Sequence, residues 1–175
     1  MKILFVGSEC VPFAKAGGLG DVVGALPKAL VRRGHDVRVV IPKYGFIDAR
    51  HFTPHPAPLG VPFGAGEAWC GVRETRLPGS DVPVCLLEHD ALFGGMSLYD
   101  HGSGMRELAR FALLSRGALQ LCRALDFAPD VLHVHDWPTS WIPVLLDGPE
   151  RRPPFVDTAT VLTLHNVAHQ PLFPA

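Results

Sequence analysis

Short apolar runs alternate with longer helical patterns along this chain, and this alternation constrains the fold more than any other feature. The strand-like runs are Ile3–Val6, Val37–Ile41, Asp130–His135 and Thr160–Leu164. Residues 20–33 and 106–125 carry apolar side chains at the spacing of a helix. Strands that alternate with helices predict an α/β fold, here a doubly wound, mostly parallel, Rossmann-like sheet.

Several segments interrupt this alternation. Pro27 lies inside the first helical pattern and predicts a kink or a late helix start, because its ring removes a backbone donor. Residues 42–66 are rich in proline and glycine, carry little periodicity and predict a long excursion, so that the expected fold is a parallel sheet with a hairpin excursion. Residues 67–77 and 82–88 predict a strand or hairpin arm and a strand that returns inward, and residues 93–104 predict a mobile surface loop. A short apolar helix is expected up to about residue 146.

The length and composition limit the class of protein. The 175 residues are enough for one domain, and 47% apolar with 19% charged residues is typical of a soluble globular core. A net charge of −1 argues against nucleic acid or an anionic membrane as a partner. The four cysteines form no C-x-x-C pair, and the apolar start is too short for a signal peptide. A cytoplasmic protein with reduced thiols, and no membrane span, is therefore expected.

A glycine-rich stretch links the first strand to the first helix. It reads Lys15-Ala-Gly-Gly-Leu-Gly-Asp-Val-Val-Gly-Ala-Leu-Pro-Lys-Ala-Leu30. Glycines let backbone N–H groups approach a ligand closely, and a helix N-terminus attracts negative charge. With Lys15 beside it, the stretch is suited to bind a phosphate. The pattern is neither a dinucleotide fingerprint nor a P-loop, so a turn that only packs a helix against the sheet stays an alternative.

Three polar clusters follow predicted strands. Lys15 with its glycines follows the first strand, Asp136 follows the run that ends at His135, and His165-Asn166 follows the last strand. In an open α/β sheet, ligands bind outside the carboxyl ends of the strands. If the sheet is parallel, all three clusters lie along one crevice, which is then the predicted site.

The same three places carry a family resemblance. The stretch from residue 15 to residue 30 closely resembles the N-terminal signature of bacterial glycogen synthases and plant starch synthases. These are two-domain, GT-B type glycosyltransferases that elongate α-1,4-glucan from ADP-glucose. His135-Asp136-Trp137 resembles the His-Asp-Trp motif of that family, and the segment from Thr163 to Gln170 is similar to its Thr-x-His-Asn-x-x-x-Gln segment.

The resemblance implies roles for individual residues. His165 would stabilise developing positive charge beside the transferred glucose, Asp136 would lie beside the donor and acceptor cleft, and Lys15 would hold the diphosphate of the leaving nucleotide. These three are the expected catalytic residues. The other expected substrate contacts, with Ser8 and Glu9 beside them, are Gly17, Gly18, Asp21, Asn166 and Gln170. Transfer with retention of configuration is implied, with neither a metal nor a cofactor.

The resemblance also implies a domain organisation. Residues 1–175 correspond to the N-terminal, acceptor-side domain, and the C-terminal nucleotide-binding domain is missing. The expected partners are ADP-glucose, an α-1,4-glucan and that second domain. One departure is the segment 106–109, Arg-Glu-Leu-Ala, where the family usually carries an Asp-Asn pair. The chain alone should have little or no transferase activity.

Two other functions are possible from the sequence. The chain can be a non-catalytic module of the same fold that binds glucan or a partner. His133-x-His135-Asp136, with His165 and His169, can also suggest a metallohydrolase, although the spacing is not a recognised zinc pattern. The ordinary roles for these residues are hydrogen bonding for His133, helix capping for Asp136, and packing for Trp137 and Trp141.

Overall fold

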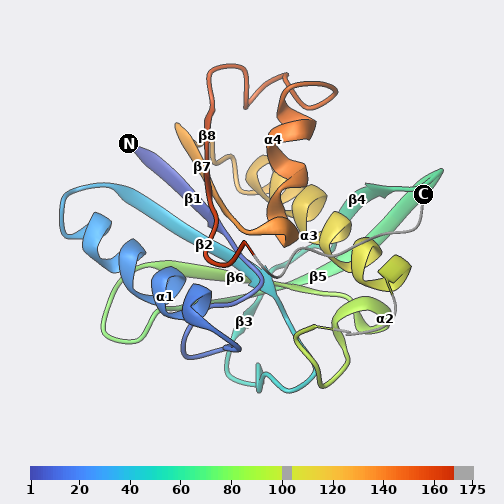
Figure 1. Ribbon diagram of the computed structural model, residues 1–175, viewed down its shortest axis with the longest axis horizontal. Helices are drawn as coiled ribbons and strands as arrows, with labels where there is room; N and C mark the ends of the chain where they lie inside the picture. The colour runs from blue at the N-terminus through green and yellow to red at the C-terminus, as the bar shows by residue number, and fades with distance from the viewer. Residues whose placement is uncertain (100–103, 168–175) are drawn as a thin grey trace.

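A computed structural model of the chain describes residues 1–99 and 104–167, and its centre is a parallel sheet (Figure 1). Five strands lie side by side in the order β6-β2-β1-β7-β8, and every neighbouring pair among them is parallel. Their bounds are Lys2–Val6 for β1, Asp36–Pro42 for β2, Pro83–Glu88 for β6, Val131–His135 for β7 and Ala159–Thr163 for β8. Each of these strands was predicted to within two residues at either end. The mostly parallel sheet is therefore confirmed.

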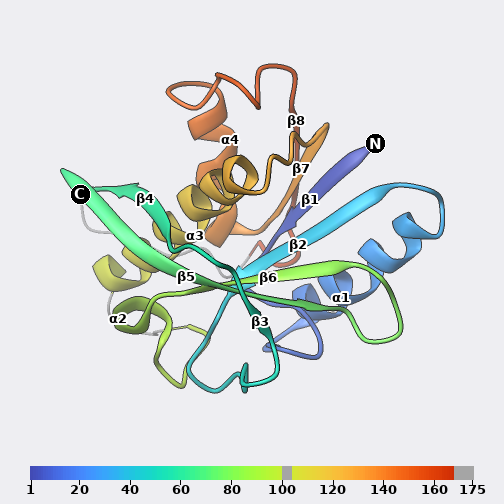
Figure 2. The same cartoon turned by 180° about the vertical axis from the view of Figure 1, so that it is seen from behind.

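An antiparallel extension continues the sheet beyond β6. It consists of β3 (Thr53–Pro54), β4 (Leu59–Phe63) and β5 (Gly66–Arg76). β5 is antiparallel to all three strands with which it pairs, namely β3, β4 and β6. Figure 2 shows the β4–β5 hairpin reaching past the parallel strands. Within the predicted excursion of residues 42–66 the structure forms β3 and β4, and in β4 Leu59 and Val61 alternate into the core between prolines that hide the strand pattern.

Helices cover both faces of the parallel strands. The bounds of the helices are Gly18–Val31 for α1, Asp90–Phe93 for α2, Gly104–Ala124 for α3 and Trp141–Leu146 for α4, with a 3₁₀ turn η1 at Trp137–Thr139. In Figures 1 and 2, α1 lies on one side of the sheet, and α3 with α4 lies on the other. The short helix α2 was not predicted.

The first helix differs from its prediction at its start. It begins at Gly18, two residues early, and continues through Pro27 to Val31. Gly34, with a φ of 84°, reverses the chain after it. Gly24 lets α1 pack closely on the preceding loop, since a Cβ there would lie 2.8 Å from the carbonyl oxygen of Val11.

Two buried clusters hold the layers together, one on each face of the sheet. One unites α3 and α4 with the outer strands and includes Phe111, Leu114, Leu119, Val134 and Ile142. The other packs α1 against the opposite face and includes Leu19, Val23, Phe5, Val39 and Ile41. A fully buried aliphatic or aromatic side chain contributes about 1.5–3 kcal/mol, so both faces stabilise the sheet. Within residues 1–99 and 104–167, no helix combines the length and apolar character that a bilayer crossing needs.

The strand order creates one special position in the sheet. From β1 the chain proceeds to β2 and β6 on one side, and it later returns to place β7 and β8 on the other side. The direction of winding therefore reverses between β1 and β7. In open α/β sheets, the crevice at the carboxyl ends of the strands beside such a reversal is where ligands bind. The residues that follow β1 and β7 are consequently the first candidates for a site.

Candidate functional site

A buried carboxylate organises the loop that follows β1. Glu9 is 3% exposed, and its Oε2 accepts the backbone N–H groups of Ala16 and Gly17 at 2.6 and 2.9 Å. Its other oxygen, Oε1, accepts the hydroxyl of Tyr99 at 2.7 Å. The same hydroxyl lies 2.8 Å from Oγ of Ser8. Glu9 thereby fixes the backbone of the glycine-rich stretch. This structural role was not expected of Glu9, and its expected contact with substrate stays a prediction.

Lys15 stands at the exposed side of this loop. Its Nζ lies 2.7 Å from both carboxylate oxygens of Asp21 in the first turn of α1, and both side chains are about half exposed. An exposed ion pair of this kind contributes little to stability, about 0–1 kcal/mol. The ammonium can therefore exchange Asp21 for a stronger anionic ligand at small cost. Lys15 and Asp21, both predicted site residues, thus lie together.

Gly17 and Gly18 have no structural reason to be glycine. A Cβ at either position would meet no atom within 4 Å, and neither residue has a positive φ. The backbone N–H of Gly17 donates to Oε2 of Glu9 at 2.9 Å, and the contact of Gly17 with a diphosphate stays a prediction. The open space over both glycines is consistent with a ligand that approaches the backbone from outside.

Asp136 and His165 lie in direct contact. Oδ1 of Asp136 accepts the backbone N–H of His165 at 2.7 Å, and the backbone N–H of Asp136 donates to the carbonyl of Thr163 at 2.9 Å. Asp136 has a φ of 55°, a left-handed conformation that is costly for a residue with a side chain. Strained residues of this kind cluster at functional sites. The ends of β7 and β8 are thereby joined at the predicted site.

Three histidine rings stack beside this contact. The ring centroids of His133 and His135 are 4.4 Å apart, and those of His135 and His165 are 5.2 Å apart. Nδ1 of His135 lies 3.0 Å from Nε2 of His165, and Nε2 of His133 lies 2.7 Å from Oγ1 of Thr163. Phe5 of β1 covers the stack, with its ring 4.6 Å from that of His133. The hydrogen-bonding role expected for His133 is confirmed.

This arrangement bears on the metallohydrolase hypothesis. Nδ1 of His135 and Nε2 of His165 face one another at 3.0 Å, and Nε2 of His133 faces Oγ1 of Thr163 at 2.7 Å, so these nitrogens are engaged with partners inside the chain. Among residues 1–99 and 104–167, no three His, Cys, Asp or Glu side chains form a group that could hold a metal ion. His169, the fourth suggested ligand, lies outside the described residues, as does Gln170.

Burial controls the protonation of the stack. Burial, and then the nearby charges of His133 and His165, lower the pKa of His135 from 6.5 to about 3. Burial and the charge of His165 also lower the pKa of His133. The His135 ring is therefore uncharged in the folded protein near neutral pH. Only one of its two ring nitrogens then carries a proton.

This shift predicts a loss of stability in mild acid. Unfolded chains bind a proton at His135 below about pH 6.5, whereas the folded protein does not until about pH 3. The free energy of unfolding should thus fall as the pH falls from about 6.5 to about 5, by up to about 1.4 kcal/mol per pH unit from this histidine. Urea unfolding across that range measures it. The matched variant His135→Asn should show a shallower slope, and an unchanged slope would contradict the prediction.

Tyr99 belongs to the hydrogen-bond network that supports the β1 loop. Its hydroxyl contacts Ser8 and Glu9 of the β1 loop. Burial is the main cause that raises the pKa of Tyr99, with the charges of Glu9 and Asp136 adding to it, so the phenol stays protonated. Sequence reasoning missed Tyr99 because it lies in a polar, glycine-rich stretch that predicts a mobile surface loop. No local pattern marks it as a partner of residues ninety positions earlier.

The remaining predicted residues have clear places. Asn166 is exposed and follows His165 directly. Trp137 packs edge-on against Phe111 with ring centroids 4.9 Å apart, so its packing role is confirmed. Trp141 is 43% exposed on α4.

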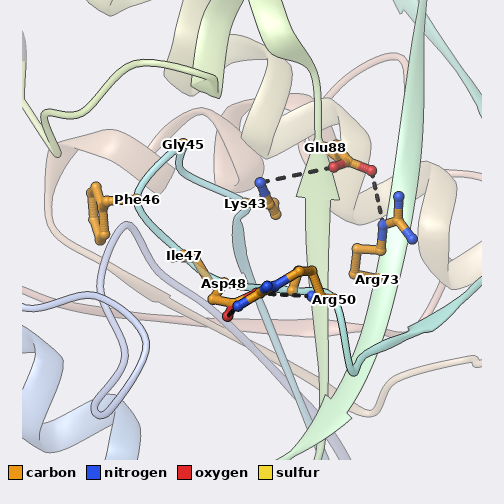
Figure 3. A pocket seen from close by; sticks show the side chains of 9 residues that line it. Lys43, Gly45, Phe46, Ile47, Asp48, Arg50, Arg73 and Glu88 are labelled. Carbon is orange, nitrogen blue, oxygen red and sulfur yellow. Dashed lines mark hydrogen bonds and ion pairs between the residues drawn. The ribbon is translucent and has the colours of Figure 1, made fainter.

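A second hollow lies farther along the same edge of the sheet, beside the ends of β2 and β6 (Figure 3). Glu88 pairs there with Lys43 at 3.9 Å and with Arg73 at 2.9 Å, and Arg50 pairs with Asp48 at 2.6 Å. Both carboxylates that line it are thus paired, and the three cations Lys43, Arg50 and Arg73 leave the lining with one excess positive charge. The sequence did not single out any of these residues.

Comparison with known proteins identifies relatives for this arrangement. The profile of a family described as the starch synthase catalytic domain matches residues 2–175. Glycogen synthase 1 of Geobacter sulfurreducens is 51% identical over 176 residues, which cover 97% of this chain and 35% of that protein. Glycogen synthase of Treponema denticola is 43% identical over 178 residues, which cover 99% of this chain and 36% of that protein.

A solved structure shows the same fold. The catalytic domain of starch synthase IV from Arabidopsis thaliana, bound to ADP and acarbose, matches with a TM-score of 0.86 at 28% identity. The match covers 96% of this chain and 34% of that one. The chain thus spans about a third of the length of the relatives it matches.

Proposed function

The chain belongs to the starch synthase catalytic-domain family, and from this premise we propose that it forms the N-terminal, acceptor-side domain of a glycogen or starch synthase. The proposed reaction transfers glucose from ADP-glucose to the non-reducing end of an α-1,4-glucan, with retention of configuration. The ADP and acarbose in the starch synthase IV structure support both a nucleotide and a glucan-like ligand for this fold. A cytoplasmic location stays a prediction.

One observation carries the proposal. Asp136 holds the backbone of His165 at 2.7 Å at the point where the sheet reverses its winding, and the buried Glu9 fixes the glycine-rich loop of Lys15 at the neighbouring strand. An ammonium, a carboxylate and an imidazole thus belong to adjacent strand ends. Such a combination suits a reaction in which a diphosphate leaves and positive charge develops on a sugar.

The proposed chemistry depends on position and charge. Lys15 would leave Asp21 and bind the diphosphate, whose negative charge grows as the glycosidic bond to it breaks. Fixed charges placed where charge develops are usually the largest contribution to such catalysis. His165, held at its backbone by Asp136, would face the sugar, and Gly17 and Gly18 would leave room for the ligand above the loop. Correct orientation of donor and acceptor supplies the rest.

The proposal includes a second domain as a partner. The chain spans about a third of the length of its relatives, and in the proposal residues outside it would complete the cleft and the nucleotide site. We expect purified residues 1–175 to show no glucan elongation from ADP-glucose. A radiolabelled glucose incorporation assay into glycogen measures it, with a full-length synthase that carries this chain as the control. Turnover by residues 1–175 alone would contradict the proposed domain organisation, and an inactive full-length protein would contradict the proposed reaction.

A specific observation favours one alternative, a non-catalytic module that binds glucan or a partner. Lys15 is neutralised by Asp21, and the N–H of Gly17 is bonded to Glu9, so part of the anion site is occupied by the chain itself. In a module of this kind, Lys15 would serve only its ion pair. The substitution of Lys15 that opens the Discussion separates the two functions.

A further inference from the structure

We propose that His135 is a positioning residue that fixes the tautomer and the ring orientation of His165. His135 is the last residue of β7, and it has no exposed surface. Its Nδ1 lies 3.0 Å from Nε2 of His165. The inference rests on the proposed function in one respect, the role of His165 beside the sugar. The tautomer itself is a property of this chain and is measurable without any activity.

The surroundings of His135 decide which atom carries its proton. Nε2 of His135 is buried and has no hydrogen-bond partner within residues 1–99 and 104–167. A buried N–H without a partner is a rare and costly arrangement, and a bare lone pair is tolerated more easily. The single proton of the neutral ring therefore belongs on Nδ1, where it has an acceptor.

That assignment determines the state of His165. If Nδ1 of His135 donates, Nε2 of His165 must accept, so it carries no proton. A neutral His165 then carries its own proton on Nδ1. The hydrogen bond at one ring nitrogen thus determines whether the other ring nitrogen carries the proton. Proteins commonly fix the tautomer of a histidine in this way.

Asp136, which follows His135 in the sequence, also restrains His165. Asp136 accepts the backbone N–H of His165 at 2.7 Å, while His135 bonds the ring. His135, the last residue of β7, therefore holds the side chain of His165, and Asp136, which follows β7, holds its main chain. Stacking of His135 on His133 and Phe5 prevents the ring of His135 from turning away. His165 is thereby presented in one orientation.

Nitrogen-15 NMR of the histidine-labelled chain tests the assignment directly. Near neutral pH, we expect His135 and His165 both to carry their proton on Nδ1, because each tautomer has distinct nitrogen shifts. Resonances are assigned by loss of one signal set in His135→Asn and in His165→Gln. A proton on Nε2 of His135 would overturn the inference.

Two variants separate positioning from simple packing. His135→Asn keeps a donor near the place of Nδ1, whereas His135→Leu keeps the bulk and removes the donor. In a full-length synthase that carries this chain, His135→Leu should lower kcat by about 10-fold or more with KM changed less than about 2-fold, the size of effect seen when an orienting partner of a ligating histidine is removed. His135→Asn should recover kcat to within about 3-fold of wild type. Equal losses in both variants would overturn the positioning role.

The outcomes also separate this inference from the proposed function. A wild-type full-length protein without transferase activity would contradict the proposed function, and the NMR assignment would still confirm or overturn the tautomer. An active wild type in which His135→Leu retains full kcat would overturn the inference and leave the proposed function intact.

Discussion

Replacing Lys15 with alanine should lower kcat for glucose transfer from ADP-glucose by about 10²–10³-fold in a full-length synthase that carries this chain. The proposed role of the ammonium is to stabilise the departing diphosphate, so its loss acts on the transition state. Steady-state assays with glycogen as acceptor measure the change. Because Lys15 is about half exposed and pairs only at the surface with Asp21, the folded structure should be preserved.

Lys28→Ala is the matched control for this substitution. Lys28 lies in the last turn of α1, the helix that begins after Lys15. Its Nζ donates a hydrogen bond to the carbonyl of Pro78, away from the carboxyl ends of the parallel strands. It should retain kcat within about 2-fold, because a surface substitution of this kind changes little. If Lys15→Ala left glucose transfer unchanged, the proposed role of Lys15 would be wrong and the result would support a non-catalytic module. Glycogen co-sedimentation, which needs no turnover, should be equal in wild type and in Lys15→Ala.

Replacing Glu9 with alanine should lower the free energy of unfolding by about 3 kcal/mol. Glu9 is buried, and its carboxylate accepts two backbone N–H groups and the hydroxyl of Tyr99. Hydrogen bonds to a charged group contribute about 1.5–3 kcal/mol each, and water that enters the space left by the side chain restores part of the loss. Urea unfolding of the chain, followed by circular dichroism, measures the change in midpoint.

Two further variants show whether the loss of stability comes from the hydrogen bonds of the Glu9 carboxylate. Glu9→Gln keeps an acceptor for the loop amides and an amide group that can bond the Tyr99 oxygen, so its loss should be less than half that of Glu9→Ala. Glu67→Ala removes an exposed carboxylate on β5 and should change stability by no more than about 0.5 kcal/mol. Equal stability of Glu9→Ala and wild type would contradict the role of Glu9 as the anchor of the glycine-rich loop.

The parallel part of the fold could be predicted from the sequence, and the antiparallel part largely could not. Strands such as Val131–His135 are continuous apolar or alternating runs bounded by polar residues, so hydrophobic pattern alone locates them. In β4, by contrast, Gly60 and Pro62 break the pattern, and the strand forms because β5 pairs with it. Long-range pairing of that kind leaves no local signal.

The site divides in the same way. The places of Asp136 and His165 follow from strand order, because residues after neighbouring parallel strands must meet at one edge. The internal partners could not be predicted, since Tyr99 reaches Glu9 across ninety positions from a segment without periodicity. The pairing of Nδ1 of His135 with His165 depends on side-chain rotation, which sequence spacing does not determine. The hydrophobic pattern of the sequence thus locates the ends of the strands, but it does not predict the side-chain contacts between the residues that follow them.

The middle strand of the five parallel strands comes before the other four in the sequence. Ile3 of β1 pairs with Val37 on one side and with Val131 on the other, so one edge of β1 stays unpaired until β7, more than a hundred residues later, has left the ribosome. Distant pairings of this kind slow folding, and an unpaired strand edge invites association with other chains meanwhile. Nascent chains stopped before β7 should therefore depend on chaperones, and the yield of soluble protein should respond more to the rate of translation than to substitutions at the site.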